Sequence, residues 1–139
     1  MMKTWVLMVL ALVLPAAAMA KEAAKEDENA PPKVAYIGMT PPFVGNYALD
    51  GGSKLHVYKA DIALKVTGAE AEAAVKRQDP LLRNQLVALF AQQTSESMGN
   101  VEAKEKLRQE ALKQLQQVMN DEEGKPIVED LLFNNLIVQ

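Results

Sequence analysis

The order of elements in the C-terminal half constrains this chain most. Residues 80–98 and 101–118 carry leucines at helical spacing, and residues 127–138 are dense in β-branched and aromatic side chains. Apolar groups that recur every three or four residues predict amphipathic helices with one buried face. The C-terminal half therefore predicts two such helices followed by a terminal strand, which favours an α+β fold.

An antiparallel hairpin is predicted before the helices. Residues 55–66 (LHVYKADIALKV) alternate with a period of two, which indicates a long strand with one buried face. Residues 43–49 predict an earlier strand, and the Pro-Pro pair at 41–42 gives it an extended lead-in, because proline cannot donate to a sheet. Residues 50–53 (DGGS) are a strong turn signal between the two strands. The predicted buried register of the long strand is His56, Tyr58, Ala60, Ile62, Leu64 and Val66.

Two helix starts can be placed from capping signals. Thr67 and Glu70 have the spacing of a capping box, so we expect an Ala-rich helix that runs to about residue 78. Asp79 should then cap a second helix with Pro80 in its first turn. The expected buried stripe of this second helix is Leu82, Leu86, Leu89, Phe90 and Gln93.

The third helix and the last strand complete the predicted fold. Gly99 should end the second helix in the left-handed conformation, and Asn100 should cap the third. Residues 127–138 have apolar groups in both registers, so we expect both faces to be partly covered; an open edge there would favour association. The fold class is α+β, a small antiparallel sheet (hairpin plus C-terminal strand) with three helices on one face, in the order β-β-α-α-α-β. The expected stripe of the third helix is Leu107, Ala111, Leu115 and Val118.

The N-terminus has the pattern of an export signal. Residues 1–20 contain a basic start, an apolar run over 5–14, a proline and a small-x-small end, which predicts a signal peptide cleaved before Lys21 and export to the periplasm. The competing interpretation is an uncleaved inner-membrane anchor, although a spanning helix needs about 20 apolar residues. Residues 21–33 are charged and predict a flexible tether. The folded domain should occupy residues 34–139.

Composition excludes several kinds of function. Formal net charge is −3; without residues 1–20, whose only charge is Lys3, there are 14 basic and 18 acidic residues, or −4. Nucleic-acid binding needs clustered positive charge, so nucleic acid is not an expected partner. With no cysteine and a single His56, the chain cannot build a zinc–thiolate site, a cysteine nucleophile or a two-imidazole site. We expect no catalytic residues, no metal and no cofactor.

Several short motifs occur in the order of a known family. They are Pro42-Phe43, Pro80-Leu81-Leu82-Arg83, Thr94 before Glu96, Leu107-Arg108, and Phe133 before Leu136-Ile137-Val138-Gln139. On these motifs, residues 42–139 resemble the FliL family of flagellar basal-body-associated proteins. The resemblance implies a stomatin-like fold and a non-enzymatic protein that forms rings around the periplasmic linker of the motor stator. It implies flagellar stator or basal-body proteins and further copies of the chain as partners, close to the inner membrane.

The resemblance also singles out positions and leaves alternatives open. The candidate interface or family-motif positions are Phe43, Arg83, Thr94, Leu107 and Phe133. Arg83 lies in the first turn of a helix, where the helix dipole disfavours a cation; it either meets a specific acidic partner or is solvated. Typical members of the family keep an uncleaved inner-membrane helix, from which the predicted cleavable signal departs. The alternative function is an exported peptide-binding or chaperone-like scaffold module unrelated to motility.

Overall fold

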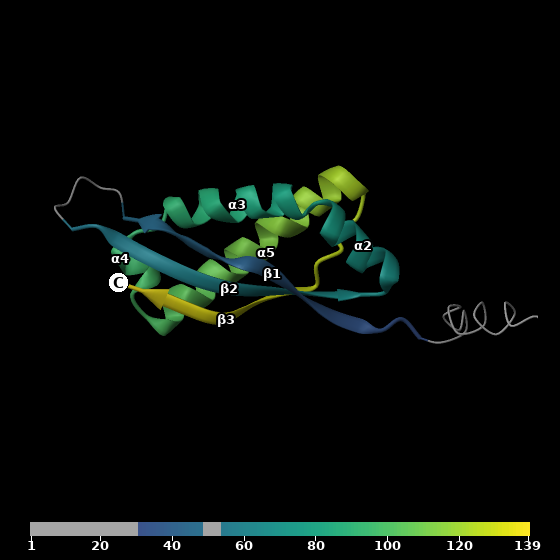
Figure 1. Ribbon diagram of the computed structural model, residues 1–139, viewed down its shortest axis with the longest axis horizontal. Coiled ribbons are helices and arrows are strands. Elements are labelled where there is room, and N and C mark those ends of the chain that lie inside the picture. Colours follow the sequence, from purple (N-terminus) through teal and green to yellow (C-terminus); the bar gives the residue numbers. More distant parts are fainter. Residues whose placement is uncertain (1–30, 49–53) are drawn as a thin grey trace, which may run out of the picture. The chain divides into compact units, whose positions relative to one another are not determined.

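The computed structural model describes residues 31–48 and 54–139 (Figure 1). The predicted signal peptide, most of the predicted tether and the predicted turn at 50–53 lie outside these residues. The folded unit is Pro32–Gln139. Its elements are β1 (Val34–Tyr47), β2 (His56–Thr67), α2 (Ala69–Arg77), α3 (Asp79–Ala91), α4 (Ser95–Met98), α5 (Val101–Glu123) and β3 (Asp130–Val138).

The three strands form one antiparallel sheet in the order β1-β2-β3. The alternating strand of the sequence, β2, is therefore central, while β1 and β3 are the two edges. The predicted α+β class and element order are confirmed, with the short helix α4 added between the second and third predicted helices. In Figure 1, α3 and α5 lie along the same side of the sheet, and they contact β1 and β3 respectively.

The first strand is longer than the sequence predicted. β1 begins at Val34, not at residue 43, so the Pro-Pro pair at 41–42 lies inside the strand. The pairing register with β2 shifts between Met39 and Phe43, and the Thr40–Pro41 peptide bond is cis. Two consecutive residues without an N–H are tolerated there because β1 is an edge strand and the prolines sit at the irregularity.

The core lies between the sheet and the helices. The predicted register of β2 is buried from Tyr58 onward, and His56 at its start is half-buried. The α3 stripe is buried as expected apart from Gln93, and α5 buries three of its four predicted residues. The fourth, Val118, is only partly buried, and Met119 takes the fully buried place.

Two predicted N-terminal helix caps are wrong. Thr67 belongs to β2 and its hydroxyl donates to Glu129, so it does not cap α2; the capping position is Gly68, at φ 97°. A left-handed backbone is available to glycine without strain, and it turns the strand directly into the helix. Asp79 is the first residue of α3, and Gln78 precedes it without a side-chain cap, because α2 and α3 are joined by this one residue.

The predicted second helix is broken before residue 98. α3 ends at Ala91, and Thr94 starts α4 with a reciprocal cap to Ser97. Gly99 has φ −90° and is not left-handed, because Asn100 already turns the chain into extended backbone. Asn100 caps α5 as predicted, since its side-chain oxygen accepts from the Ala103 N–H at 2.8 Å.

β3 is more open than its composition indicated. Its side toward the helices buries Leu131 and partly buries Phe133, Leu136 and Val138. Its opposite side leaves Ile137 exposed. The expectation that both faces of the last strand are partly covered holds at Leu132, which is half-buried, but not at Asn135 and Ile137. The described helices that contact the sheet lie on its other face.

Candidate protein-interaction surfaces

Three of the five predicted positions gather around one aromatic ring, that of Phe90 in α3. The Phe43 ring lies 5.9 Å from it, edge-on at 78°, and the Phe133 ring lies at 6.3 Å. The Arg83 guanidinium stacks over Phe43, with Cζ 4.2 Å from the ring centroid. These residues come from β1, α3 and β3, so the family motifs at both sheet edges meet in one cluster on the helix side of the sheet. This Phe90 cluster consists of Phe43, Arg83, Phe90 and Phe133.

The hydrogen-bond partners of Arg83 lie within the same domain. Its Nη2 donates to the carbonyl oxygens of Pro41 and Pro42, the latter at 3.4 Å. Its Nη1 is buried and has no hydrogen-bond partner among the described residues. The carbonyl dipoles and the Phe43 ring stabilise the cation at a helix position that is otherwise unfavourable for it. Arg83 therefore fixes the irregular centre of β1, and its positive charge also offsets part of the rise that burial causes in the pKa of Tyr58.

The other two predicted positions lie at the α4–α5 end of the domain. Thr94 accepts from the Ser97 N–H at 3.1 Å, and its own N–H donates to Ser97 Oγ at 2.9 Å. Leu107 is buried in the core. Thr94 and Leu107 both border one shallow, open depression together with charged residues such as Lys106 and Glu110. The structure thus brings Thr94 and Leu107 together but separates them from the Phe90 cluster.

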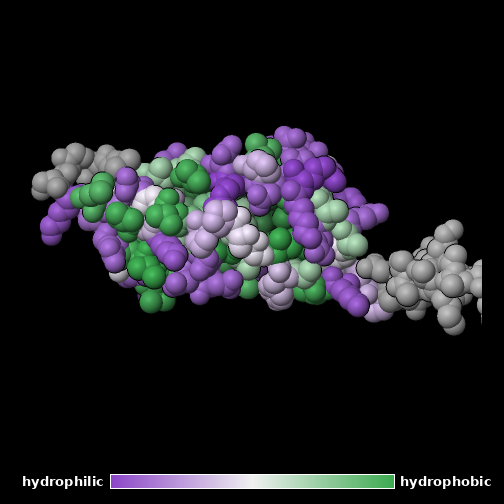
Figure 2. All heavy atoms as spheres, viewed as in Figure 1, coloured by the Kyte–Doolittle hydropathy of each residue, from purple (hydrophilic) through white to green (hydrophobic). Residues whose placement is uncertain are grey.

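The uncovered face of the sheet carries exposed apolar side chains. On β1, Tyr36 is 59% exposed and Val44 67%, and on β3, Ile137 is 44% exposed. Val44 and Ile137 flank Lys59 in a single row across the three strands. Figure 2 shows apolar atoms gathered over the end of the sheet that carries the β1–β2 connection. Exposed apolar groups on one face favour protein contact.

Sequence reasoning missed this face because it placed residues 34–42 outside the sheet. Apolar residues do stand at every second position, at Ala35, Ile37 and Met39, which is the period of a strand, although Val34 and Tyr36 between them are apolar too. The prolines at 41–42 concealed it, since a proline normally argues against a continuing strand.

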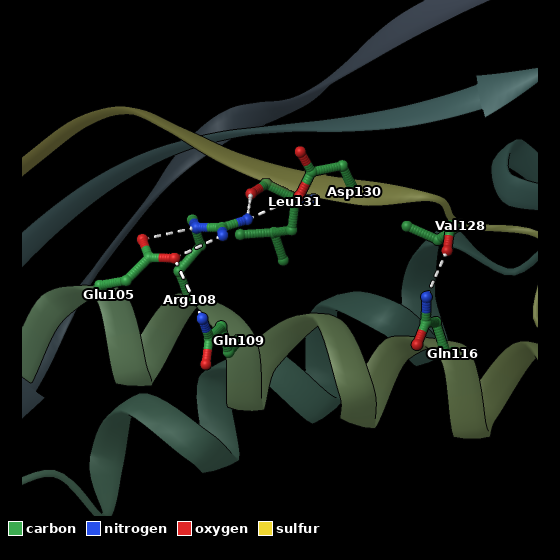
Figure 3. A network of polar contacts seen from close by, with 7 residues as sticks. All are labelled: Glu105, Arg108, Gln109, Gln116, Val128, Asp130 and Leu131. Carbon is green, nitrogen blue, oxygen red and sulfur yellow. Dashed lines mark hydrogen bonds and ion pairs between the residues drawn. The ribbon is translucent and has the colours of Figure 1, made fainter.

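Side chains of α5 reach the open edge of β3 near its beginning (Figure 3). Arg108 Nη1 lies 2.6 Å from Asp130 Oδ1 and donates to the Leu131 carbonyl at 3.2 Å. Gln116 Nε2 donates to the Val128 carbonyl at 2.9 Å. Glu105, paired with Arg108 at 2.6 Å, has its pKa held below the usual range chiefly by the hydrogen bond from Arg108. α5 thus occupies backbone acceptors only as far as Leu131.

Within 31–48 and 54–139, no group of three acidic or histidine side chains is placed to hold a metal ion. None of the described helices combines the length and the apolar character needed to cross a bilayer. Among the described residues, the exposed apolar side chains of the uncovered sheet face are the feature that favours protein contact.

The fold and these surfaces define the class: a small α+β domain with a three-stranded antiparallel sheet that helices cover on one face only. The family model described as "Flagellar basal body-associated protein FliL" matches residues 36–139, and the chain belongs to this family. It is 26% identical over 116 residues to "Flagellar protein FliL" of Aquifex aeolicus (strain VF5), which covers 83% of this chain and 68% of that protein. The resemblance drawn from the motifs is confirmed, and the match begins at residue 36, ahead of those motifs.

Proposed function

We propose that this flagellar basal-body-associated protein is a non-enzymatic accessory of the motor, which self-associates and supports the stator during swimming or swarming. The observation that carries the proposal is the extent of the family match. It begins at residue 36 and continues to residue 139, so it includes all of the sheet and helices except the first two residues of β1. The whole folded unit, and not one motif, is therefore of the FliL type.

The uncovered sheet face is the surface that we assign to the motor partner. Val44 lies beside Lys59 and Tyr36 lies beside Lys65 on this face, so a partner would meet exposed apolar side chains next to cations. Such a mixture suits a protein surface that has apolar residues and at least one acidic group. The Phe90 cluster on the opposite side packs against both edge strands and so stabilises the sheet that presents this face.

The proposed location is the periplasm, next to the inner membrane. Residues 1–20 would direct export, and residues 21–33 would connect the domain to whatever holds it in place. If residues 1–20 are retained, they anchor the domain to the inner membrane. Western blotting of the full chain in membrane and periplasmic fractions, with mass determination of its N-terminus, separates the two cases.

A clean deletion strain tests the function. We expect slower swimming and smaller soft-agar rings, with a defect that grows as viscosity is raised and disappears on complementation. A stator accessory is needed most when load is high, so the load dependence is the informative readout. Normal motility at every viscosity would contradict the proposal. Broad binding of the purified protein to unfolded clients would then favour the exported peptide-binding module.

A second experiment assigns the surface. Val44→Glu places a negative charge on the uncovered sheet face, and Val87→Glu does the same on the exposed side of α3, where Val87 is 46% exposed. In complementation, Val44→Glu should leave protein level unchanged and fail to restore swimming under load, whereas Val87→Glu should restore it. Equal complementation by both variants would show that the sheet face is not the contact.

A further inference from the structure

Some backbone groups of β3 point away from its neighbour β2. Gln139 exchanges both backbone hydrogen bonds with Val57, at 2.9 and 3.2 Å. Backbone groups of successive residues in an antiparallel strand point alternately toward and away from the neighbour. The N–H and C=O groups of Val138 and Leu136 therefore point away from β2. The Arg108 bond to the Leu131 carbonyl shows that Leu131 also faces outward.

A bulge changes the spacing of these outward groups. Asp61 pairs with Asn135 and the next β2 residue, Ile62, pairs with Phe133, so Asn134 is the extra residue of β3. Phe133 consequently faces outward like Leu131, and the outward pair Phe133 and Leu136 stands three residues apart. In a straight strand the corresponding residues are two apart. A straight guest strand cannot stay in register on both sides of the bulge.

The edge beyond Leu131 is unoccupied by other described residues. No side chain of residues 31–48 or 54–130 bonds the backbone of residues 132–138. The sequence from 131 to 139, LLFNNLIVQ, contains no charged side chain and no proline. Natural edge strands are usually protected from pairing by such residues. Beyond Leu131, the bulge at Asn134 is the protective feature that remains.

We propose that β3 pairs with β3 of a second copy, antiparallel, about a two-fold axis between Asn134 and Asn135. The second copy has the same bulge at the facing position, so it alone reproduces the three-residue spacing. Phe133 then faces Leu136 of the second copy, and these outward groups exchange backbone hydrogen bonds. The side-chain pattern has the same symmetry, since LLFN is followed by NLIV.

The pairing also matches side chains on each face. Leu132 meets Ile137 of the second copy on the uncovered face, and Phe133 meets Leu136 on the helix side. Apolar cross-strand pairs of this kind stabilise a sheet. Each pair occurs twice because a two-fold contact is self-complementary. Because a two-fold contact closes at two copies, it gives the self-association in the proposed function, on which it rests, the form of a dimer.

Disulfide trapping tests the register in the full chain, which has no cysteine of its own. Leu132→Cys and Ile137→Cys are placed on separately tagged copies and co-expressed. They would form a pair that is not hydrogen-bonded, in which Cα atoms lie about 4.5 Å apart, within the range of a disulfide. We expect the mixed pair to form a disulfide dimer under mild oxidation. A pair of Val44→Cys copies, which are more exposed but lie on β1, should not.

Three outcomes are distinguished. A mixed disulfide well above the Val44→Cys control supports the β3 contact. No mixed disulfide, while an amine cross-linker still captures oligomers, overturns the β3 contact and leaves self-association standing. No oligomer by either method overturns both. If the two variants fold poorly, Asn134→Cys with Asn135→Cys gives the same test at exposed positions.

A charge test adds a readout that trapping cannot bias. Ile137→Lys should weaken self-association about tenfold, because both symmetry-related cross-strand pairs lose their apolar contact. Val44→Lys is the matched control, since Val44 and Ile137 flank Lys59 in the same row but on opposite edges. Analytical ultracentrifugation of the full chain in detergent measures both. Equal self-association of the two variants would overturn the proposal.

Discussion

The two edge strands of the sheet differ in how far helix side chains cover their backbone carbonyls. The β1 edge is interrupted at its centre by the prolines at 41–42, whose carbonyls are held by Arg83 from α3. The β3 edge is covered by Arg108 and Gln116 from α5 only at its beginning. The same device, a helix side chain on edge carbonyls, thus closes the middle of one edge and leaves most of the other free. The backbone groups of an edge strand that no side chain covers can pair with another chain.

The two arginines also differ in how they are held. Arg108 has carboxylate partners on α5 and β3, and these raise its pKa further above the usual value. Arg83 has only carbonyl oxygens and an aromatic ring, with one nitrogen left without a partner among the described residues. Arg83 holds two carbonyl groups at the centre of β1 and stacks on Phe43, so its removal should affect the domain more.

The largest effect should come from the residue that supports both edges. Phe90→Ala removes the ring that packs against Phe43 of β1 and Phe133 of β3, and should lower the free energy of unfolding by about 4 kcal/mol. Urea unfolding followed by circular dichroism measures this. Val87→Ala, an exposed position on the same helix, is the control and should change stability by less than about 1 kcal/mol.

Arg83→Met should come next. It keeps an apolar stem and removes the charged hydrogen bonds to the proline carbonyls, which we expect to cost about 2 kcal/mol. Arg108→Met should cost less, because its ion pairs are partly exposed. Lysine at position 83 should not rescue, since it cannot reproduce the planar contact with the ring. A larger loss of unfolding free energy for Arg108→Met than for Arg83→Met would show that the arginine at the β3 edge contributes more to stability than the one at the β1 edge.

Two glycines of β1, Gly45 and Gly38, test how tightly the strand packs on either side of its irregular centre. A Cβ at Gly45 would lie 2.9 Å from the Tyr58 hydroxyl and 3.0 Å from its ring, whereas a Cβ at Gly38 would have no atom of another described residue within 4 Å. Gly45→Ala should therefore destabilise by about 1.5 kcal/mol through overpacking. Gly38→Ala should be close to neutral. Thermal melting of both variants is sufficient, and equal losses would show that the Tyr58 contact is not what requires glycine.

The smallest effect concerns the ion pair at the covered start of β3. The pKa of Glu105 is lowered in the folded protein, so its contribution to stability is present above the ordinary value of 4.5 and is lost as pH falls through the folded pKa. Wild type should lose slightly more stability between pH 5 and pH 3 than Glu105→Gln does. Urea unfolding at these pH values checks it; parallel pH profiles would show that the pair is not formed in solution.

The sequence was most informative where side chains repeat regularly. The alternation from Tyr58 to Val66 predicted the central strand, and the leucine stripes predicted α3 and α5, because burial on one face imposes a period. Local signals that depend on tertiary neighbours were less informative. Thr67 has capping-box spacing, but it pairs with Val34 in the sheet and is the last residue of β2.

The candidate surfaces were less predictable than the fold. The motif residue Arg83 was identified, but its partners Pro41 and Pro42 depend on a long-range contact that no spacing in the sequence reveals. The open edge of β3 could not be predicted either, because strand order within a sheet is not encoded in the pattern of one strand. The composition of residues 131–139 did indicate that an open edge there would associate.

Hydrogen exchange of the full chain at increasing protein concentration tests the difference between the two edges most directly. It compares peptides from 131–139 with peptides from 34–47 in the same sample. Protection of the outward-facing amides of Phe133, Leu136 and Val138 should rise with concentration while β1 is unchanged, because only β3 acquires new hydrogen bonds. Protection that stays constant in β3, or that rises in β1 instead, would contradict the conclusion that β3 is the edge left open for pairing.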